Sequence, residues 1–350
     1  MGQESLQILI VMVVYMAAVI GIGIFFARRA NADTEKFFLG GRSLGPWVSA
    51  MSAEASDMSG WLLMGLPGVA YWCGLADAFW TAAGLAVGTY INWLVVSKRL
   101  RRYSIAANNA ITLPEFFSNR FHEKKKVIMG ISAAFILVFF TVYAASCLVT
   151  CGKLFSTLFG APYITMMLVG AAFVLIYTLL GGFLAESASD FMQAIVMVVV
   201  LVAVLTLGVA SAGGLGAVFE NVKDFPGFLE FFGIADPVTE GGVQLAVNGV
   251  PSFGARQDYG ALNVASMLAW GLGYFGMPQV LLRFMAIREE KELNLSRRIA
   301  TVWVVISMAI AIAIGVIGLA VTKAGSIPFL GSSAEAETII IQLANLMSQH

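Results

Sequence analysis

Long apolar runs, separated by shorter polar stretches, follow one another along the chain from its start to about residue 322. A helix needs about 20 apolar residues to cross the hydrocarbon core of a bilayer. Eight runs approach or reach this length, and they predict membrane-spanning helices at about 6–26, 46–72, 76–96, 127–155, 163–184, 189–210, 264–286 and 299–322. The pattern predicts an all-α polytopic membrane protein in which residues 1–350 form a single transmembrane domain.

The composition agrees with a membrane protein and argues against several other classes. Apolar residues make up 59% of the 350 residues and charged residues 12%, about half the share in a soluble domain. The formal net charge is zero, so nothing points to a nucleic-acid partner. Cys73, Cys147 and Cys151 fit no disulfide framework and lack the further ligands of a zinc site. The two histidines, His122 and His350, accompany no nucleophile or metal-ligand cluster, so we expect neither an enzyme nor an organic cofactor.

Basic residues predict which side of the membrane each loop faces. Most of the 21 Lys and Arg residues lie in three alternate stretches, 28–45, 97–126 and 283–298. Cytoplasmic loops carry such an excess, so these stretches are expected inside the cell membrane and the N-terminus outside it. Residues 211–263 would then form a long extracytoplasmic loop, either a solvated connector or a segment with a short interfacial helix or outer cover.

The run 46–72 contains Glu54 and Asp57 near its middle, where a charge is costly. Small, weakly helical residues surround Asp57, namely Ser56, Ser59 and Gly60. An acid among such residues at mid-membrane predicts a broken helix whose freed backbone groups line a cavity or bind a ligand. The alternative is a kinked helix whose acid is protonated or paired inside the bundle.

A second interruption is predicted in the run 264–286, which contains the sequence WGLGYFGMP at 270–278. Three glycines and a proline within one span favour a discontinuous helix, with a kinked packing helix as the alternative. Paired interrupted spans are the best sequence pointer to a transporter binding site. Because they are the second and the seventh spans, two five-helix units would start from opposite sides of the membrane, as an inverted repeat does.

Two glycines and two carboxylates lie where the fifth predicted span gives way to the sixth. Gly181 and Gly182 allow a close helix contact or a tight turn. Glu186 and Asp190 follow near the cytoplasmic boundary, where simple solvation of both carboxylates is the alternative to a functional role.

Five stretches carry a resemblance that runs through almost the whole chain in order. They are GGRSLGPWVSAMSAEASDMSGWLLMGLPG at 40–68, TLPEFFSNRF at 112–121, FFTVYAAS at 139–146, YTLLGGFLA at 177–185 and WGLGYFGMPQVLLRFMA at 270–286. They resemble the solute:sodium symporter family, and within it the bacterial sodium/proline symporters. The chain departs from the pattern at Glu54, where at least some members have a small residue.

The resemblance implies a five-plus-five inverted-repeat transporter fold with one extra N-terminal helix. The family continues for several helices beyond the position of His350, so the resemblance also implies a C-terminally incomplete fold. On that basis we expect the chain alone to be an inactive fragment, unless a second polypeptide or dimerisation completes it.

For sodium, the resemblance implies backbone carbonyl ligands at the end of an inner half-helix near Ala55. Ala55 and Met58 would supply the carbonyls, and Asp57 would support the ion electrostatically. Asp190 resembles a carboxylate on the inner sodium exit path. Further hydroxyl ligands of the family lie on a later helix that this chain lacks.

For the substrate, the resemblance implies an outer half-helix that starts near Ser59 and Gly60 and offers N–H groups to an amino-acid carboxylate. Aromatic faces suit a compact apolar ring beside a secondary ammonium. The residues implied for the substrate pocket are Ser59, Gly60, Trp61, Tyr143, Trp270, Tyr274 and Pro278. Taken singly, Tyr143 and Trp270 are more often packing residues than ligands.

The resemblance implies sodium-coupled import of L-proline by alternating access. One alternative is a sodium- or proton-coupled symporter for another small carboxylate or solute. Proton coupling stays open because Glu54 and Asp57 lie one turn apart. A transporter-like sensor module is a further alternative, although it would normally be followed by a signalling domain.

Overall fold

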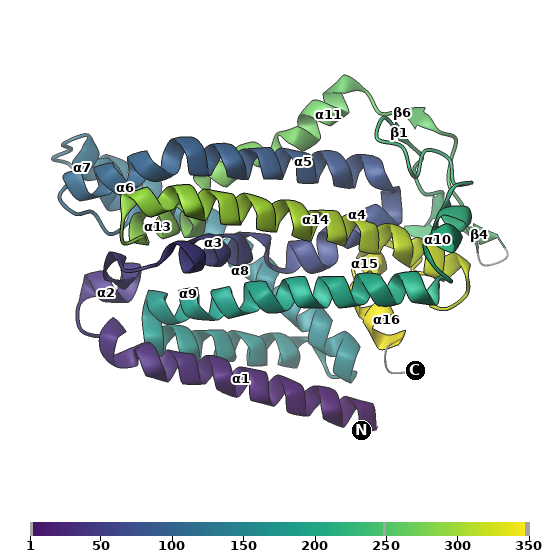
Figure 1. The fold of residues 1–350 in the computed structure, drawn as a ribbon, viewed down its shortest axis with the longest axis horizontal. Coiled ribbons are helices and arrows are strands. Elements are labelled where there is room, and N and C mark those ends of the chain that lie inside the picture. Colours follow the sequence, from purple (N-terminus) through teal and green to yellow (C-terminus); the bar gives the residue numbers. More distant parts are fainter. Residues whose placement is uncertain (1–2, 248–249, 347–350) are drawn as a thin grey trace. The chain divides into compact units, whose positions relative to one another are not determined.

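The computed structural model describes residues 3–247 and 250–346, apart from the side chains of residues 3–6 and of Ser59. Most of these residues are helical and the strands are short (Figure 1). The chain forms two compact units. The first comprises Met1–Asp57, Thr89–Ile195 and Phe275–Thr301, and the second comprises Met58–Gly88, Val196–Tyr274 and Val302–His350.

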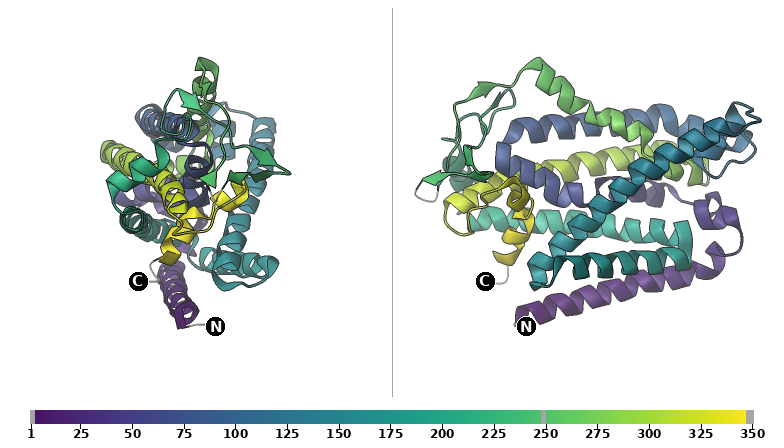
Figure 2. Two further views of the ribbon diagram at one scale, coloured as in Figure 1. Left: turned by 90° about the vertical axis from the view of Figure 1, so that its right-hand side faces the viewer. Right: turned by 180° about the vertical axis from the view of Figure 1, so that it is seen from behind.

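The first unit is built from helices, some of which continue along the chain into the second unit. The helices that lie wholly within it are α1 Gln3–Ala30, α2 Thr34–Leu39, η1 Gly40–Arg42, η3 Asn92–Val96, α6 Ser97–Ala106, α7 Leu113–Arg120, α8 Val127–Phe159, α13 Pro278–Ala286 and η5 Glu290–Glu292. The helices divided between the two units are α3 Pro46–Gly60, α5 Leu75–Ile91, α9 Tyr163–Ser211 and α14 Leu293–Lys323. Helix α1 lies alongside the first part of α9 (Figure 2), where a Cβ built on Gly23 would be 3.2 Å from the Tyr177 carbonyl oxygen.

Side-chain caps start two short helices of this unit. Asp33 accepts a hydrogen bond from the backbone N–H of Lys36 (2.8 Å) at the start of α2. Thr112 accepts one from the Glu115 N–H (3.3 Å) at the start of α7, and the Glu115 carboxylate accepts one from the Ile111 N–H (2.9 Å) in return. These caps satisfy N–H groups that have no partner within the helix.

Helix α9 consists of two helices joined at Gly182. This residue has φ 53° and ψ −153°, a conformation that only glycine adopts readily. A Cβ built there would lie 2.7 Å from the Phe37 carbonyl oxygen, so α2 also leaves no room for a side chain. A Cβ on Gly181 would lie 2.7 Å from the Gly23 carbonyl oxygen. The pair therefore serves both predicted purposes, a tight turn at Gly182 and a close helix contact at Gly181.

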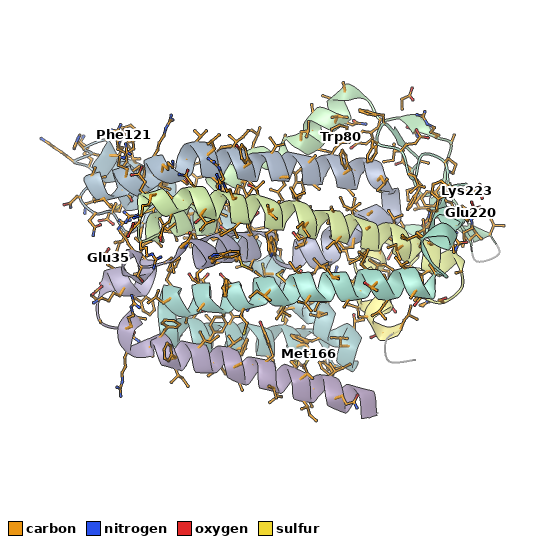
Figure 3. All side chains as sticks on the ribbon, viewed as in Figure 1. Glu35, Trp80, Phe121, Met166, Glu220 and Lys223 are labelled. Atoms are coloured by element: carbon orange, nitrogen blue, oxygen red, sulfur yellow. The ribbon has the colours of Figure 1, made fainter. Side chains whose placement is uncertain are left out.

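The second unit combines helices with three two-stranded antiparallel sheets. Its remaining helices are η2 Trp61–Gly65, α4 Leu66–Cys73, α10 Leu215–Val222, α11 Ala261–Leu268, α12 Trp270–Gly273, α15 Ser333–Ala336 and α16 Ile339–Asn345. The sheets pair β1 Gly233–Ile234 with β6 Gln257–Asp258, β2 Thr239–Glu240 with β3 Val243–Gln244, and β4 Ala246–Val247 with β5 Val250–Pro251. The predicted long loop at 211–263 thus contains α10 and these strands, and Figure 3 labels the Glu220–Lys223 ion pair of α10.

The break predicted at residues 55–60 is wrong in position and in form. Helix α3 keeps helical geometry to its last residue, Gly60 (φ −65°, ψ −21°). The irregularity comes later, as a π-helical turn at Trp61–Gly65 just before Pro67. Because proline offers no N–H to the preceding turn, the wider turn falls where an α-helical hydrogen bond would be missing. Hence no inner half-helix ends near Ala55 and no outer half-helix starts at Gly60.

The second predicted interruption is confirmed. Helices α11 and α12 and the 3-10 turn η4 (Tyr274–Gly276) follow one another, and Met277 then leaves the helical region (φ −74°, ψ 106°). Helix α13 begins at Pro278, which forces the preceding residue into an extended conformation. Proline suits this first position because the N–H there needs no helical partner.

Five helical stretches among the described residues are long and apolar enough to cross a membrane. They cover Gln7–Ala30, Leu75–Ala106, Val127–Phe159, Tyr163–Ser211 and Glu290–Lys323, and Trp61–Cys73 is a shorter apolar helix. The turn at Gly182 divides the fourth of these stretches into two helices. The count of eight spans stays a prediction.

Candidate functional site

Arg283 lies at the centre of a buried polar cluster in the first unit, to which α3, α9 and α13 contribute. The arginine is 1% exposed, and its guanidinium donates to Asp190 Oδ2 (2.9 Å) and to Glu186 Oε1 (3.1 Å). It also donates to the Gln279 carbonyl oxygen one turn earlier (3.0 Å). The Phe183 ring centroid lies 4.9 Å from the guanidinium carbon. Asp190 is only 7% exposed, so the simple solvation considered for this carboxylate is wrong.

Ser52 and Ser56, one turn apart on α3, complete the cluster. Each hydroxyl donates to Asp190 Oδ2, at 2.8 and 2.9 Å respectively. Each also accepts from Arg283, Ser52 from Nε at 2.9 Å and Ser56 from Nη2 at 3.0 Å. Because a hydroxyl carries one proton and two lone pairs, both serines are satisfied in this arrangement.

The charges of the cluster do not balance. One guanidinium meets the carboxylates of Asp190 and Glu186, and no other ion pair of these two carboxylates is seen among the described residues. The Glu186 side chain is 34% exposed and the Asp190 side chain 11%, so the cluster is more open on the Glu186 side. Buried ion pairs depend on good geometry and extra hydrogen bonds to offset their desolvation. The arrangement can attract a cation, and it also holds three helices in register.

Further contacts in the same unit fix α13 against the start of α3. The Ser49 hydroxyl donates to the Arg283 carbonyl oxygen (3.1 Å). Leu44 and Ile287 form a parallel β-bridge just outside the two helices. Arg101 of α6 donates to the Ile287 carbonyl oxygen (2.8 Å). These bonds satisfy polar groups at the end of α13. They hold this helix in place although the break at Met277 separates it from the preceding helices.

The residues predicted to bind sodium lie next to this cluster along α3. Ala55 is 7% exposed and lies within the continuous helix. Asp57 is half-buried and makes no hydrogen bond or ion pair with the described residues. Tyr143 of α8, predicted for the substrate pocket, donates to the Ser56 carbonyl oxygen (2.8 Å). Met58, the next residue after Asp57, is fully buried in the second unit.

Glu54 has a partner of its own in the first unit. It is fully buried and accepts a hydrogen bond from Trp93 Nε1 (3.1 Å). Trp93 lies in the π-helical turn η3, and its ring packs on Phe284 of α13 with centroids 4.4 Å apart. Glu54 is therefore a buried acid with a hydrogen-bond partner inside the first unit.

Two of the predicted substrate residues stack on each other in the second unit. The rings of Trp61 and Trp270 have centroids 5.3 Å apart and planes inclined by 25°. Trp270 begins α12 and is 49% exposed, so the stacked pair is partly accessible. Glycines press α12 against α5. A Cβ on Gly271 would lie 2.1 Å from the Gly84 carbonyl oxygen, and one on Gly88 would lie 2.3 Å from the Gly271 carbonyl oxygen.

The other predicted substrate residues have separate surroundings. Tyr274 is 1% exposed in the second unit. Gly60 is half-buried at the end of α3, and the side chain of Ser59 lies outside the described part of the structure. Pro278, in the first unit, lines an apolar pocket of about 520 Å³ together with residues of α7 and α8. The lining of that pocket includes no residue of the Arg283 cluster.

Sequence reasoning missed the centre of the site. It placed Arg283 in a cytoplasmic loop, whereas this arginine is buried on α13. It treated Ser56 as a small, weakly helical residue and did not consider Ser52, so neither was predicted as a hydrogen-bond partner. The available signals are an arginine inside an apolar segment, five residues after a helix-breaking proline, and two serines one turn apart on the acid-bearing helix.

Comparison with known proteins gives consistent results. The sequence pattern of the Sodium:solute symporter family matches residues 37–349. The sodium/proline symporter of Escherichia coli (strain K12) is 38% identical over 343 residues, which are 98% of this chain and 63% of that protein. The osmoregulated proline transporter OpuE of Bacillus subtilis (strain 168) is 38% identical over 317 residues, 90% of this chain and 59% of that protein. This chain thus spans 59–63% of the length of these relatives.

One solved structure is similar in fold. It is a Na+-coupled sialic acid symporter in a substrate-bound, outward-open state, which matches with a TM-score of 0.72 and 15% sequence identity. The match covers 98% of this chain and 68% of that one. At this identity the likeness concerns the fold alone. With the family pattern matched over residues 37–349, the chain belongs to the sodium:solute symporter family.

Proposed function

We propose that this protein is a sodium-coupled secondary transporter that imports L-proline by alternating access. The sodium/proline symporter and the proline transporter named above, each 38% identical to this chain, support the proposal. The structural observation that carries it is the buried cluster of Arg283, Asp190 and Glu186 on interrupted or turned helices. Ionisable groups inside a membrane domain characteristically mark ion and substrate pathways.

For sodium, we assign the binding region to α3 and the inner route to Asp190. Asp190 and Glu186 together carry more negative charge than Arg283 compensates, so a cation is attracted there. Ala55 and Met58 are the proposed carbonyl ligands, with Asp57 as electrostatic support. Since both ligands lie within α3, their carbonyls become available where the helix loosens, and the π-helical turn begins three residues after Met58.

For proline, the proposed residues in the second unit are Ser59, Gly60, Trp61, Trp270 and Tyr274, and those in the first unit are Tyr143 and Pro278. The stacked faces of Trp61 and Trp270 suit a small apolar ring that carries an ammonium group. Transport needs no covalent chemistry. The side chains need only bind sodium and proline together more favourably than they bind either one alone.

We further propose the five-plus-five inverted repeat, with an extra N-terminal helix, eight spans in this chain and the N-terminus outside the cell membrane. The fold likeness to a Na+-coupled symporter supports this arrangement. The distribution of Lys and Arg supports the orientation.

Proton coupling is the second candidate, and Glu54 is the observation that favours it. A fully buried carboxyl that accepts a hydrogen bond from Trp93 can carry a proton at mid-membrane. The ion that supports proline binding separates the two candidates.

The test is an equilibrium binding measurement of proline on the purified protein in sodium, in potassium, and in potassium at a series of pH values. We expect proline binding in sodium and little in potassium at any pH. Binding in potassium that grows as the pH falls would favour the proton instead. Absence of proline binding in all three conditions, while another small carboxylate binds in sodium, would overturn the substrate assignment.

Single substitutions sharpen this test. Asp57→Asn keeps the size and removes the charge, so we expect the sodium concentration for half-maximal proline binding to rise about tenfold or more, equivalent to about 1.4 kcal/mol. Trp270→Ala should weaken proline binding by about 0.5–2 kcal/mol through the lost aromatic face. Asp33→Asn at the start of α2 and Trp47→Ala, an exposed tryptophan, are the matched controls.

A further inference from the structure

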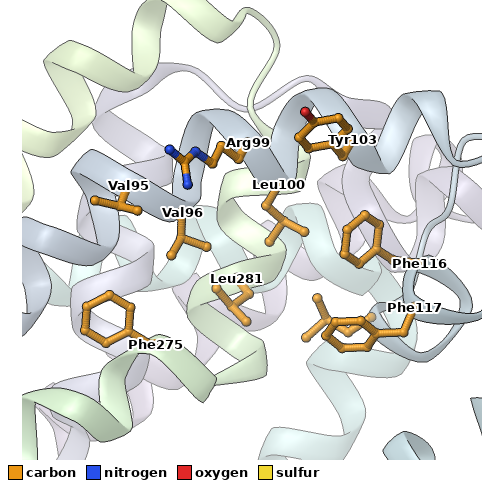
Figure 4. Close-up of a pocket in the computed structure, with 10 residues that line it drawn as sticks. Val95, Val96, Arg99, Leu100, Tyr103, Phe116, Phe117, Phe275 and Leu281 are labelled. Atoms are coloured by element: carbon orange, nitrogen blue, oxygen red, sulfur yellow. The ribbon is translucent and has the colours of Figure 1, made fainter. Parts of the chain in front are cut away.

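An apolar groove crosses the surface of the first unit between η3–α6, α7 and α13. Its volume is about 280 Å³, and its walls include Val95, Val96, Leu113, Phe117, Phe275 and Leu281 (Figure 4). We call this the α6–α13 groove. Val95 and Phe117 are each 39% exposed, whereas Leu281 in the floor is 8% exposed. The groove is thus open along its sides and closed at its base.

The groove faces lipid if the protein crosses a membrane as proposed. Its first wall belongs to Leu75–Ala106, a stretch long and apolar enough to span a bilayer. Aliphatic and aromatic side chains line it, and none of its lining residues is acidic. An open furrow with such walls fits a hydrocarbon chain, and the absence of a lining carboxylate removes a partner for a choline or ammonium headgroup.

The wall of the groove formed by η3 and α6 carries an exposed cation. Val95, Arg99 and Tyr103 follow one another at intervals of four residues, so they share a face of the helix. Arg99 is exposed, makes no hydrogen bond or ion pair with the described residues, and lies above Val95 and Val96 in Figure 4. Tyr103, 46% exposed, places its phenol beyond it.

Two neighbouring arginines on α6 are already engaged. Arg101 donates to the Ile287 carbonyl oxygen (2.8 Å), and Arg102 forms an ion pair with Glu290 (2.7 Å). Arg120 of α7 lies over the Tyr103 ring at 5.4 Å. Arg99 is therefore the lining cation left to meet an anion at the mouth of the groove.

We propose that the α6–α13 groove binds one anionic phospholipid, with an acyl chain along Val96 and Leu281 and the phosphate on Arg99. Basic residues at the cytoplasmic end of apolar helices attract anionic headgroups, and amphipathic aromatics such as Tyr103 favour the same interfacial depth. The lining of this site shares no residue with those proposed for sodium and proline.

The floor of the groove gives the lipid a connection to the interrupted span. Phe275 and Leu281 flank the break at Met277–Pro278 on its two sides. A chain lying on both residues favours the packing of α13 against α6 that is seen here. Occupancy by lipid is thus coupled to the position of the helix that carries Arg283.

The test compares retention of two lipids with identical acyl chains, phosphatidylglycerol and phosphatidylcholine, by native mass spectrometry of the delipidated protein. We expect one phosphatidylglycerol to be retained in preference to phosphatidylcholine. Arg99→Ala should reduce this retention about fivefold, as one basic contact is lost. Val95→Trp, which fills the open side of the groove, should reduce it without a change in charge.

Arg28→Ala is the matched control, because Arg28 is an exposed basic residue at the end of α1 and outside the groove lining. Gel filtration of each variant confirms that it is folded. Equal retention of the two lipids by the wild-type protein would overturn the proposal, and that comparison needs no variant. An equal loss in Arg28→Ala and Arg99→Ala would also overturn it, because the attraction would then be a general property of the basic surface.

Discussion

At the scale of single residues, Arg283 and Asp190 are the pair on which the first unit depends most directly. We expect Arg283→Gln to destabilise the protein by about 3–5 kcal/mol, because it leaves the Asp190 carboxylate buried without its cation. The double variant Arg283→Gln/Asp190→Asn should regain part of that loss. The stability of each variant is measured as the temperature at which the purified protein loses its monodisperse peak.

The control for this pair is Arg288→Gln. Arg288 pairs with Glu292 at 2.6 Å, but its side chain is 57% exposed. Such exposed pairs contribute less than about 1 kcal/mol, so its melting temperature should stay close to that of the wild type. If Arg283→Gln and Arg288→Gln behaved alike, the buried cluster would not stabilise the unit.

The sequence identified part of this residue-scale picture and missed the rest for a physical reason. Asp190 was identified only through the family resemblance, because its position near the cytoplasmic boundary left simple solvation open. Arg283 was not identified because it lies at the end of an apolar run, where an arginine is commonly a solvated residue of a cytoplasmic loop. Whether such a residue turns inward depends on partners far away in the chain, here more than 90 residues distant, as Arg283 is from Asp190.

At the scale of elements, Gly271 and Gly273 form a natural pair of test positions on α12. A Cβ on Gly271 would overlap the Gly84 carbonyl oxygen of α5, whereas a Cβ on Gly273 would meet nothing within 4 Å. We expect Gly271→Ala to destabilise by about 1–3 kcal/mol through overpacking. Gly273→Ala should be neutral or slightly stabilising, since alanine favours helix. Equal thermal stability of the two variants would contradict the close packing of α12 on α5.

A second element-scale contact ties the segment before α11 to the start of α5. The Tyr259 hydroxyl donates to the Asp77 carboxylate, and Trp80 Nε1 donates to the Phe231 carbonyl oxygen (2.7 Å). Burial, followed by the hydrogen bond to Asp77, raises the pKa of Tyr259 above the ordinary value of about 10. A raised folded pKa means that the contact stabilises fully below pH ~10 and is lost as the pH rises through that folded pKa.

The direction of this pKa shift predicts the outcome of an alkaline titration that is followed by tyrosinate absorbance. The difference between wild type and Tyr259→Phe isolates the ionisation of Tyr259, which should occur above pH ~10. Asp77→Asn should move that step down toward the ordinary value, because the carboxylate no longer disfavours the phenolate. A step already at the ordinary value in the wild type would show that the contact does not form in solution.

The sequence predicted the elements better than it predicted their breaks. Hydrophobic runs located the helices, and Pro278 with its glycines located one interruption, since proline there has a direct backbone consequence. For the other interruption, serines and Gly60 suggested a break that did not occur, because these residues also accept helical geometry when neighbouring helices hold them. The actual irregularity follows from Pro67, whose effect falls on the turn before it.

At the scale of the whole molecule, the orientation in the membrane is the prediction with the widest consequences. In a background with the native cysteines replaced by serine, Lys125→Cys should react only with reagents that enter the cytoplasm. Asp224→Cys, which is also exposed, should react from outside in intact cells. The reverse pattern would invert the topology and remove the basis for the inverted repeat.

The contact between Trp61 and Trp270 has an optical consequence. Two indole rings stacked at 5.3 Å have electronic transitions that couple, so the pair produces an exciton couplet in circular dichroism that isolated tryptophans do not give. A molecule that slides between the rings or tilts one of them removes the couplet. The second unit therefore carries a label-free reporter of ligand binding at the Trp61–Trp270 pair. It can be measured on the purified protein in solution, without reconstitution into vesicles.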